Sequence, residues 1–128
     1  MDKMLVDTDI LIDVSWGVTN AIQRLDIEAQ ASLLTISVIT QMELLIGCRN
    51  KNELRILDHF LKRFDILQLN ENISTNAIDL LRKYRLSHGL LIADSLIAAT
   101  ALYLEIPLLT KNQSDYVYID EIKVLRYP

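Results

Sequence analysis

Four acidic residues, far apart in the chain, have the types and positions that a divalent-cation site needs: Asp7, Glu43, Asp94 and Asp115. Carboxylates gathered in one place without cations would repel one another, and their pKa values would rise. A cluster of oxygen ligands is what Mg²⁺ or Mn²⁺ prefers. Such a cation activates water and neutralises charge at an in-line displacement, so the pattern indicates phosphoryl chemistry.

The first of these acids stands in LVDTDILID, residues 5–13, where acids separate two apolar runs. Asp7 directly follows a predicted strand, and an Asp at that place can also be the N-cap of the next helix. Asp9 could equally be that cap, which would leave Asp7 unexplained. We expect Asp7 to be a metal ligand, Asp9 to cap the helix or support the site, and Asp13 to be a surface or structural residue.

Glu43 lies next to an apolar stripe formed by Ile39, Met42 and Ile46 on one predicted helix. Glutamate is almost never buried unless it is paired or bound to a metal, so its place beside this stripe indicates a specific role. A local explanation competes with this one. Thr40 and Glu43 have the spacing of a capping box, in which the glutamate reaches back to the threonine amide.

Asp94 and Asp115 also have local alternatives. Asp94 interrupts the apolar run 90–101 and could be an N-cap, but the helix that it starts is apolar nearly all round, which brings the carboxylate to the rim of the core. Asp115 follows a predicted strand that ends at Thr110. It shares with Asn112 a loop of the composition that ordinary turns have.

Short apolar runs alternate with helical patterns along the chain. This order predicts βαβ units and a parallel sheet covered by helices on both faces, which is a three-layer α/β/α domain. In such sheets ligands bind outside the carboxyl ends of the strands, where the four acids are expected. Strands are predicted at 3–6, 33–38, 65–69, 107–110 and 123–127, and helices from about residue 9 and at 18–30, 39–47, 52–64, 73–89 and 94–106.

The composition of the 128 residues fits a single domain, residues 1–128, with a sizeable core, because 51% of the residues are hydrophobic. The longest uncharged stretch, 29–42, is shorter than the roughly 20 apolar residues of a membrane helix, so we expect no membrane span. The single Cys48 and the absence of a signal-peptide pattern favour the cytoplasm. The net charge of −4 argues weakly against a nucleic-acid partner, but four carboxylates in one metal site would account for all of it.

The chain contains four motifs in this order: LVDTDILID at 5–13, ITQMELLIG at 39–47, IADSLIAATAL at 92–102 and PLLTKNQSDY at 107–116. In order and spacing they resemble the motifs of PIN-domain ribonucleases. The resemblance covers essentially the whole chain, and the length and solitary domain resemble the VapC-type toxins of bacterial toxin–antitoxin pairs.

This resemblance implies an Mg²⁺- or Mn²⁺-dependent endoribonuclease that hydrolyses RNA phosphodiester bonds. It implies that the family's metal-binding acids correspond to Asp7, Glu43, Asp94 and Asp115. Asn112 would orient a ligand or water, and Thr8 and Thr110 would flank the site. A neighbouring antitoxin would occupy the cleft, and a homodimer is expected. The chain departs from the family at Ser15-Trp16-Gly17, where a basic residue before Gly is frequent.

A phosphotransferase or phosphoacceptor domain is the alternative function, because DTD after a strand is similar to the Asp-x-Asp of haloacid-dehalogenase-like phosphatases. Those enzymes continue with Gly-Thr, whereas this chain has Ile10-Leu11. A binding module without activity is a third possibility, and the presence of all four acids counts against it. His59 and His88 have no metal-ligand partner at suitable spacing, so we expect structural or surface roles for both.

Overall fold

Parallel strands form the central sheet of the computed structural model, which describes residues 2–128. Within these residues the sheet has five strands in the order β3-β2-β1-β4-β5, and every neighbouring pair is parallel. The chain thus adds β2 and β3 on one side of β1 and then β4 and β5 on the other. The strands are β1 Asp2–Val6, β2 Ser32–Ser37, β3 Asp65–Leu67, β4 Leu108–Leu109 and β5 Val124–Leu125.

Helices occupy the crossovers that the alternating sequence pattern predicts. The described helices are α1 Thr8–Ser15, α2 Thr19–Ala29, α3 Val38–Ile46, α4 Lys51–Leu61, α5 Glu71–His88 and α6 Ile92–Leu104, followed by the short 3₁₀ helix η1 Gln113–Asp115. Each predicted helix and strand is present, with ends that differ by a few residues. The short η1 lies in a stretch that was predicted as a loop, because Asn, Ser and Asp cluster there as they do in ordinary turns.

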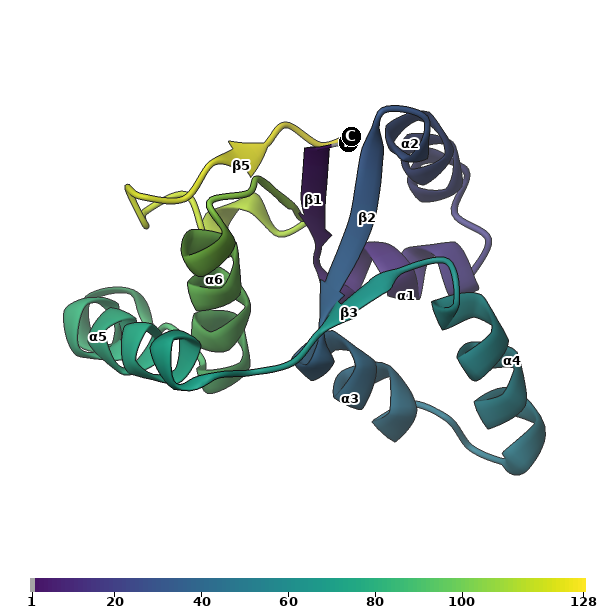
Figure 1. Cartoon of the computed structure of the whole chain (residues 1–128), viewed down its shortest axis with the longest axis horizontal. Helices are drawn as coiled ribbons and strands as arrows, with labels where there is room; N and C mark the ends of the chain where they lie inside the picture. The colour runs from purple at the N-terminus through teal and green to yellow at the C-terminus, as the bar shows by residue number, and fades with distance from the viewer. Residues whose placement is uncertain (1) are drawn as a thin grey trace.

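Alternating side chains of β1 enter two hydrophobic cores on opposite faces of the sheet. Leu5 packs with residues of α5 and α6, whereas Met4 and Val6 pack with residues of α1, α2 and α4. Figure 1 shows the same division, with α5 and α6 on one side of the strands and α1, α2 and α4 on the other. The predicted three-layer α/β/α architecture is therefore confirmed.

The most apolar helix, α6, is buried as its composition predicts. Ala98, Ala99 and Ala101 lie in the core that α6 shares with α5. Small side chains at these positions let the two helices pack closely, as close-packed protein interiors require. None of the helices within residues 2–128 has both the length and the hydropathy that a membrane span needs.

The centre of the sheet is the place where strand order reverses. Leu5 pairs with Leu108 and Val6 with Leu109, so the residues that follow β1 and β4 emerge together. The Asp7 amide extends this pairing by donating to the Leu109 carbonyl at 2.9 Å. The sheet therefore presents Asp7 and Thr110 side by side at its switch point, where ligands bind in open α/β sheets.

Candidate active site

Asp7 is held at the carboxyl end of β1 by two donors. Its Oδ1 accepts a hydrogen bond from the Thr8 amide at 2.8 Å, and its Oδ2 accepts one from the Thr110 hydroxyl at 2.8 Å. The side chain is buried, with the residue only 5% exposed, and it is the N-cap of α1. Asp7 is therefore both the cap of α1 and one of the acids of the candidate site.

The surroundings of Asp7 disfavour its ionised form. Burial raises its pKa to about 7, and the negative charges of Asp9 and Asp94 act in the same direction. The hydrogen bonds from Thr110 and Thr8 lower the pKa, but they do not offset the loss of hydration. A carboxylate in this position would gain strongly from a nearby cation.

Asp9 supports the loop that follows β4 and does not cap α1, so the expectation of a cap was wrong. The helix begins at Thr8, which places Asp9 within its first turn. Asp9 Oδ2 accepts hydrogen bonds from the amides of Lys111 at 3.1 Å and Asn112 at 2.9 Å, and lies 3.2 Å from the Thr110 hydroxyl. Its other oxygen, Oδ1, is buried without a hydrogen-bond partner among residues 2–128.

Glu43 accepts a hydrogen bond from a hydroxyl group of α1 and does not form a capping box. Helix α3 begins at Val38 and is capped by Ser37, whose hydroxyl oxygen accepts from the Ile39 amide at 3.0 Å. Thr40 is therefore inside the helix, and the capping-box alternative is wrong. Instead the Thr8 hydroxyl donates to Glu43 Oε1 at 2.7 Å, while the Thr8 and Thr40 hydroxyl oxygens lie 2.9 Å apart.

Asp94 is the third residue of α6, and the N-cap of that helix is Leu91, which makes no side-chain cap. The N-cap alternative for Asp94 is therefore wrong. Its Oδ1 accepts a hydrogen bond from the hydroxyl of the fully buried Tyr116 at 3.1 Å. Burial raises the pKa of Asp94, the Tyr116 bond lowers it, and the charges of Asp115 and Glu43 raise it further.

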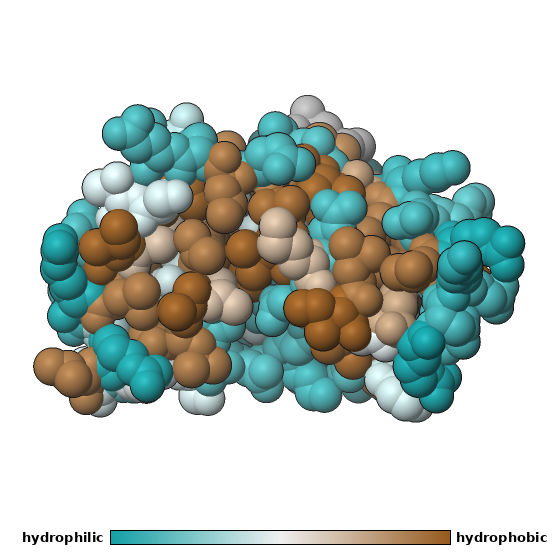
Figure 2. Space-filling model, turned by 90° about the horizontal axis from the view of Figure 1, so that it is seen from below, coloured by the Kyte–Doolittle hydropathy of each residue, from teal (hydrophilic) through white to brown (hydrophobic). Residues whose placement is uncertain are grey.

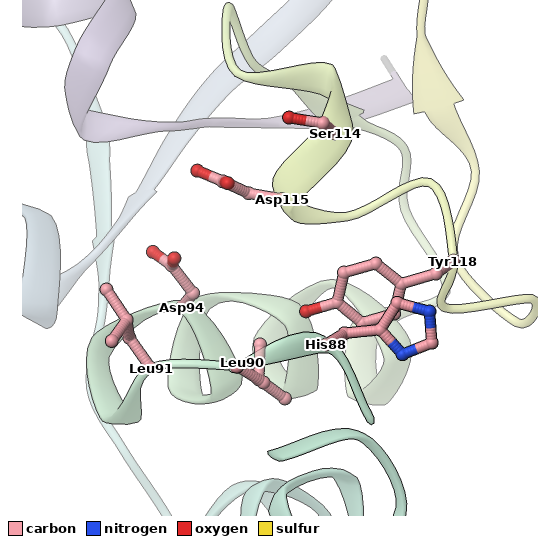
Figure 3. Close-up of a pocket in the computed structure, with 8 residues that line it drawn as sticks. His88, Leu90, Leu91, Asp94, Ser114, Asp115 and Tyr118 are labelled. Carbon is pink, nitrogen blue, oxygen red and sulfur yellow. The ribbon is translucent and has the colours of Figure 1, made fainter. Parts of the chain in front are cut away.

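Asp115 ends η1, is exposed, and lines a cavity together with residues at the start of α6. The cavity has a volume of about 170 Å³. Figure 3 shows the Asp94 and Asp115 carboxylates on the same side of this hollow, with the rings of His88 and Tyr118 beside them. Its lining consists of His88, Gly89, Leu90, Leu91, Asp94, Ser114, Asp115 and Tyr118.

The four predicted acids share one electrostatic environment. Asp94 feels the charges of Glu43 and Asp115, and Asp7 feels that of Asp94. Lys111, the basic residue nearest in sequence to Thr110, pairs with Asp13 at 3.1 Å, so Asp13 has the structural role predicted for it. Among the described residues, no three His, Cys, Asp or Glu side chains form a ready-made metal cage.

Three aromatic or imidazole side chains lie around these acids, and no motif in the sequence assigns them to the site. The sequence indicates nothing about Tyr116 except that it follows Asp115, yet this buried residue donates its hydroxyl hydrogen bond to Asp94. The sequence around Tyr118 contains no such signal, and His88, expected to be structural or on the surface, is exposed. Both line the cavity that contains Asp94 and Asp115. Only the packing of the C-terminal segment against α5 brings these groups together.

A family model described as PIN domain matches residues 4–120 of the chain. The match extends from β1 to beyond η1 and therefore includes all four predicted acids. The motifs that resembled this family thus lie within the matched region.

Curated relatives match over nearly the whole chain. Ribonuclease VapC10 of Mycobacterium tuberculosis is 35% identical over 121 residues, which is 94% of this chain and 90% of the relative. Ribonuclease VapC1 of Methanocaldococcus jannaschii is 32% identical over 127 residues, covering 98% of this chain and 87% of the relative.

Solved structures share the fold. A toxin–antitoxin complex from Klebsiella pneumoniae superposes with a TM-score of 0.82 at 31% identity and covers 97% of both chains. VapBC2 from Rickettsia felis, bound to a DNA fragment from its promoter, superposes with a TM-score of 0.82 at 23% identity over 98% of both chains. From the family match, the identity to its relatives and the shared fold, the chain belongs to the PIN-domain family and is similar to the VapC ribonucleases.

Proposed function

We propose that this protein is an Mg²⁺- or Mn²⁺-dependent endoribonuclease, the toxin of a type II toxin–antitoxin pair. The observation that carries the proposal is the meeting of acids from four distant segments at the switch point of the sheet. The negative charge of Glu43 raises the pKa of Asp94, and the negative charge of Asp94 raises the pKa of Asp7. The ribonuclease names of the curated relatives support the same substrate class.

The donor set fits a hard divalent cation. Asp7 is a buried carboxylate whose pKa is raised to about 7, and Asp9 Oδ1 is buried without a partner in the described part of the chain. Mg²⁺ usually keeps several waters and takes only one or two carboxylates directly, so a preformed cage of three ligands is not required. The residues proposed to hold the cation are Asp7, Glu43, Asp94 and Asp115.

The cation, when bound, would supply charge neutralisation at the scissile phosphate and a more acidic attacking water. The chain itself contributes the positions of the carboxylates. Thr110 and the Thr8 amide hold Asp7, and the Tyr116 hydroxyl holds Asp94 Oδ1. Thr8 orients Glu43 from a second helix. The reaction adds water across one P–O bond of the RNA backbone, which leaves a phosphate on one product and a hydroxyl on the other.

The edge of the sheet that carries the acids also exposes apolar side chains. Figure 2 views the molecule from the side toward which β1 and β2 point in Figure 1, and hydrophobic residues cover much of that face. On α3, Met42 is 50% and Ile46 is 84% exposed, and Leu91 and Ile92 are exposed at the start of α6. An apolar surface of this kind marks a protein interface. We assign it to the antitoxin, which would cover the site and inhibit the enzyme.

We also propose that the protein forms a homodimer and acts on cellular RNA in the cytoplasm. Light scattering of the purified chain measures the oligomeric state directly.

An Ile46→Glu variant tests the antitoxin surface, because a charge in an apolar interface weakens binding of the protein encoded beside this chain's gene. Unchanged binding would move the antitoxin to another surface.

RNA cleavage is the direct test of the enzyme. Purified protein with Mn²⁺ is expected to cut single-stranded RNA, and Asp94→Asn is expected to reduce the rate roughly 100-fold or more. Asp58→Asn is a matched control, because Asp58 is an exposed acid on α4. Accumulation of a stable acyl-phosphate on the protein after incubation with a phosphodonor would instead favour a phosphoacceptor.

A further inference from the structure

Two stacked rings stand beside the acids and have no role in the function proposed above. His88 is the last residue of α5, and Tyr118 lies between η1 and β5. Their ring centroids are 4.1 Å apart and the ring planes differ by 11°, which is a parallel stack. The buried Tyr84 supports the pair from below, with its centroid 5.2 Å from that of Tyr118.

The two rings are not buried in the hydrophobic core. His88 is exposed and Tyr118 is half-buried, whereas Tyr84 is buried. Both rings line the cavity of about 170 Å³ whose other wall includes Asp94 and Asp115. Figure 3 shows the rings and the two carboxylates around this one hollow.

The turn between α5 and α6 holds the backbone around His88. The Arg85 guanidinium donates to the Gly89 carbonyl at 3.0 Å and to the Leu90 carbonyl at 3.2 Å. Gly89 has a φ of +72°, which ends α5 without the strain that a side chain would meet there. The His88 Nδ1 lies 2.7 Å from the Ser87 hydroxyl, which restrains the imidazole. The His88 side of the stack is therefore held in place without a ligand.

The charge of the cavity decides which part of an RNA it can take. Asp94 and Asp115 are the charged residues of the lining, which, over residues 2–128, contains no Lys or Arg. A phosphate would be repelled there in the absence of a bridging cation. A nucleobase is uncharged and planar, and its amino groups can donate to a carboxylate or to Ser114.

We propose that His88 and Tyr118 form a subsite that stacks the nucleobase next to the phosphate that is cut. This inference rests on the proposed ribonuclease function and adds to it the means of holding the substrate. Single-stranded RNA is commonly bound by stacking its unpaired bases on His and Tyr rings, with little dependence on base identity. The subsite therefore selects for unpaired RNA at the cleavage point, because a paired base could not enter the stack.

The test begins with the full chain, Mn²⁺ and a mixed-sequence single-stranded RNA, on which the cleavage site is mapped. Steady-state KM and kcat are then measured for His88→Leu and Tyr118→Leu, which keep apolar bulk but lose the aromatic face. Both are expected to raise KM about 5- to 100-fold with a smaller change in kcat. Tyr118→Phe keeps the ring and is expected to stay within about twofold of the wild type. His59→Leu is the matched control, since His59 is an exposed histidine on α4.

A second measurement separates stacking from loss of structure. An RNA that lacks the base on one side of the cut is expected to show the same rise in KM with wild-type protein. His88→Leu should then add no further effect, because base and ring belong to one contact. His88 is exposed, so this variant is expected to fold even if Tyr118→Leu does not.

Two results would contradict the base-stacking subsite, and one would contradict the ribonuclease function on which it rests. If the Leu variants keep the wild-type KM, or raise it equally on intact RNA and on RNAs lacking either flanking base, the rings do not hold a base. If the wild-type protein cuts no RNA, the ribonuclease proposal fails first. Cleavage with an unaltered KM in the variants leaves the ribonuclease standing and removes only the subsite.

Discussion

The Thr110 hydroxyl donates to Asp7 Oδ2 at 2.8 Å, although the two residues are 103 positions apart in the chain. The contact exists because β1 and β4 are neighbours in the sheet, so that the first residue after each strand emerges at the same edge. Asp7 is the most buried of the four predicted acids. This bond therefore ties the most costly charge of the site to the loop that carries Asp115.

Thr110→Val is expected to destabilise the protein increasingly as pH rises. The loss of the donor raises the pKa of Asp7 and leaves an ionised carboxylate less satisfied, which costs about 1–3 kcal/mol of unfolding free energy. Urea denaturation at pH 5 and pH 8 measures the difference. Thr100→Val is the matched control, because the buried Thr100 hydroxyl donates to the Leu96 carbonyl at 2.8 Å. An equal cost at both pH values for Thr110→Val would contradict this account.

Asp7 is expected to make the metal-free protein less stable as pH rises from about 4 to about 7. Its pKa is raised from 3.8 to about 7, mainly by burial, so the folded state holds this proton more tightly than the unfolded chain does. The Asp7 contribution is therefore complete below pH 4 and is lost by pH 7, at a cost of about 4 kcal/mol at most.

Asp7→Asn is expected to flatten that pH dependence, since asparagine caps a helix as well as aspartate does and carries no charge. Thermal unfolding in chelator across pH 4–8 measures the effect. Asp58→Asn removes an equal charge from the exposed face of α4 and should leave the slope unchanged. An Asp7→Asn protein that follows the wild-type slope would show that Asp7 is not the group responsible.

Tyr116→Phe is expected to act through Asp94. The Tyr116 hydroxyl bond lowers the pKa of Asp94, so its removal raises that pKa and shifts the acidic limb of the activity profile to higher pH. We expect a loss of about tenfold in kcat, of the size seen when residues that orient metal ligands are removed. The pH–rate profile separates this positioning role from simple destabilisation, which would leave the limb in place.

Asp9→Asn and Asp9→Ala are expected to differ. Asparagine keeps an acceptor for the Lys111 and Asn112 amides, whereas alanine leaves both without a side-chain partner. Alanine should lower the unfolding free energy by about 1–3 kcal/mol. Both variants should lower the pKa of Asp7, because both remove the charge of Asp9 that raises it. Identical stability of the two variants would mean that Asp9 does not brace the loop.

The fold followed from the order of apolar runs in the chain. The run 33–38 is apolar and contains several β-branched residues, and it forms β2 at Ser32–Ser37. Reversal of strand order then placed the residues after β1 and β4 together, as the general rule for parallel sheets expects. The meeting of Asp7 with the loop after Thr110 was thus predictable from topology without any side-chain detail.

Local roles within the site were less predictable, because they depend on where a helix begins. A shift of one or two residues decides whether Asp7 or Asp9 is the cap, and helix ends are not defined that sharply by a sequence. Tyr116 and the His88–Tyr118 stack depend on how the irregular C-terminal segment packs against α5 and α6. Such contacts join residues of no fixed spacing, so no sequence pattern reports them.

We propose that the carboxylates at the switch point hold a divalent cation that the protein needs to cut RNA. Cleavage of a labelled single-stranded RNA is followed with the purified chain and Mn²⁺, with excess chelator, and with the Asp94→Asn variant to test this claim. We predict cleavage by the wild type with Mn²⁺, none with chelator, and roughly 100-fold less with the variant. Cleavage that persists in chelator, or at an equal rate in Asp94→Asn, would contradict the claim.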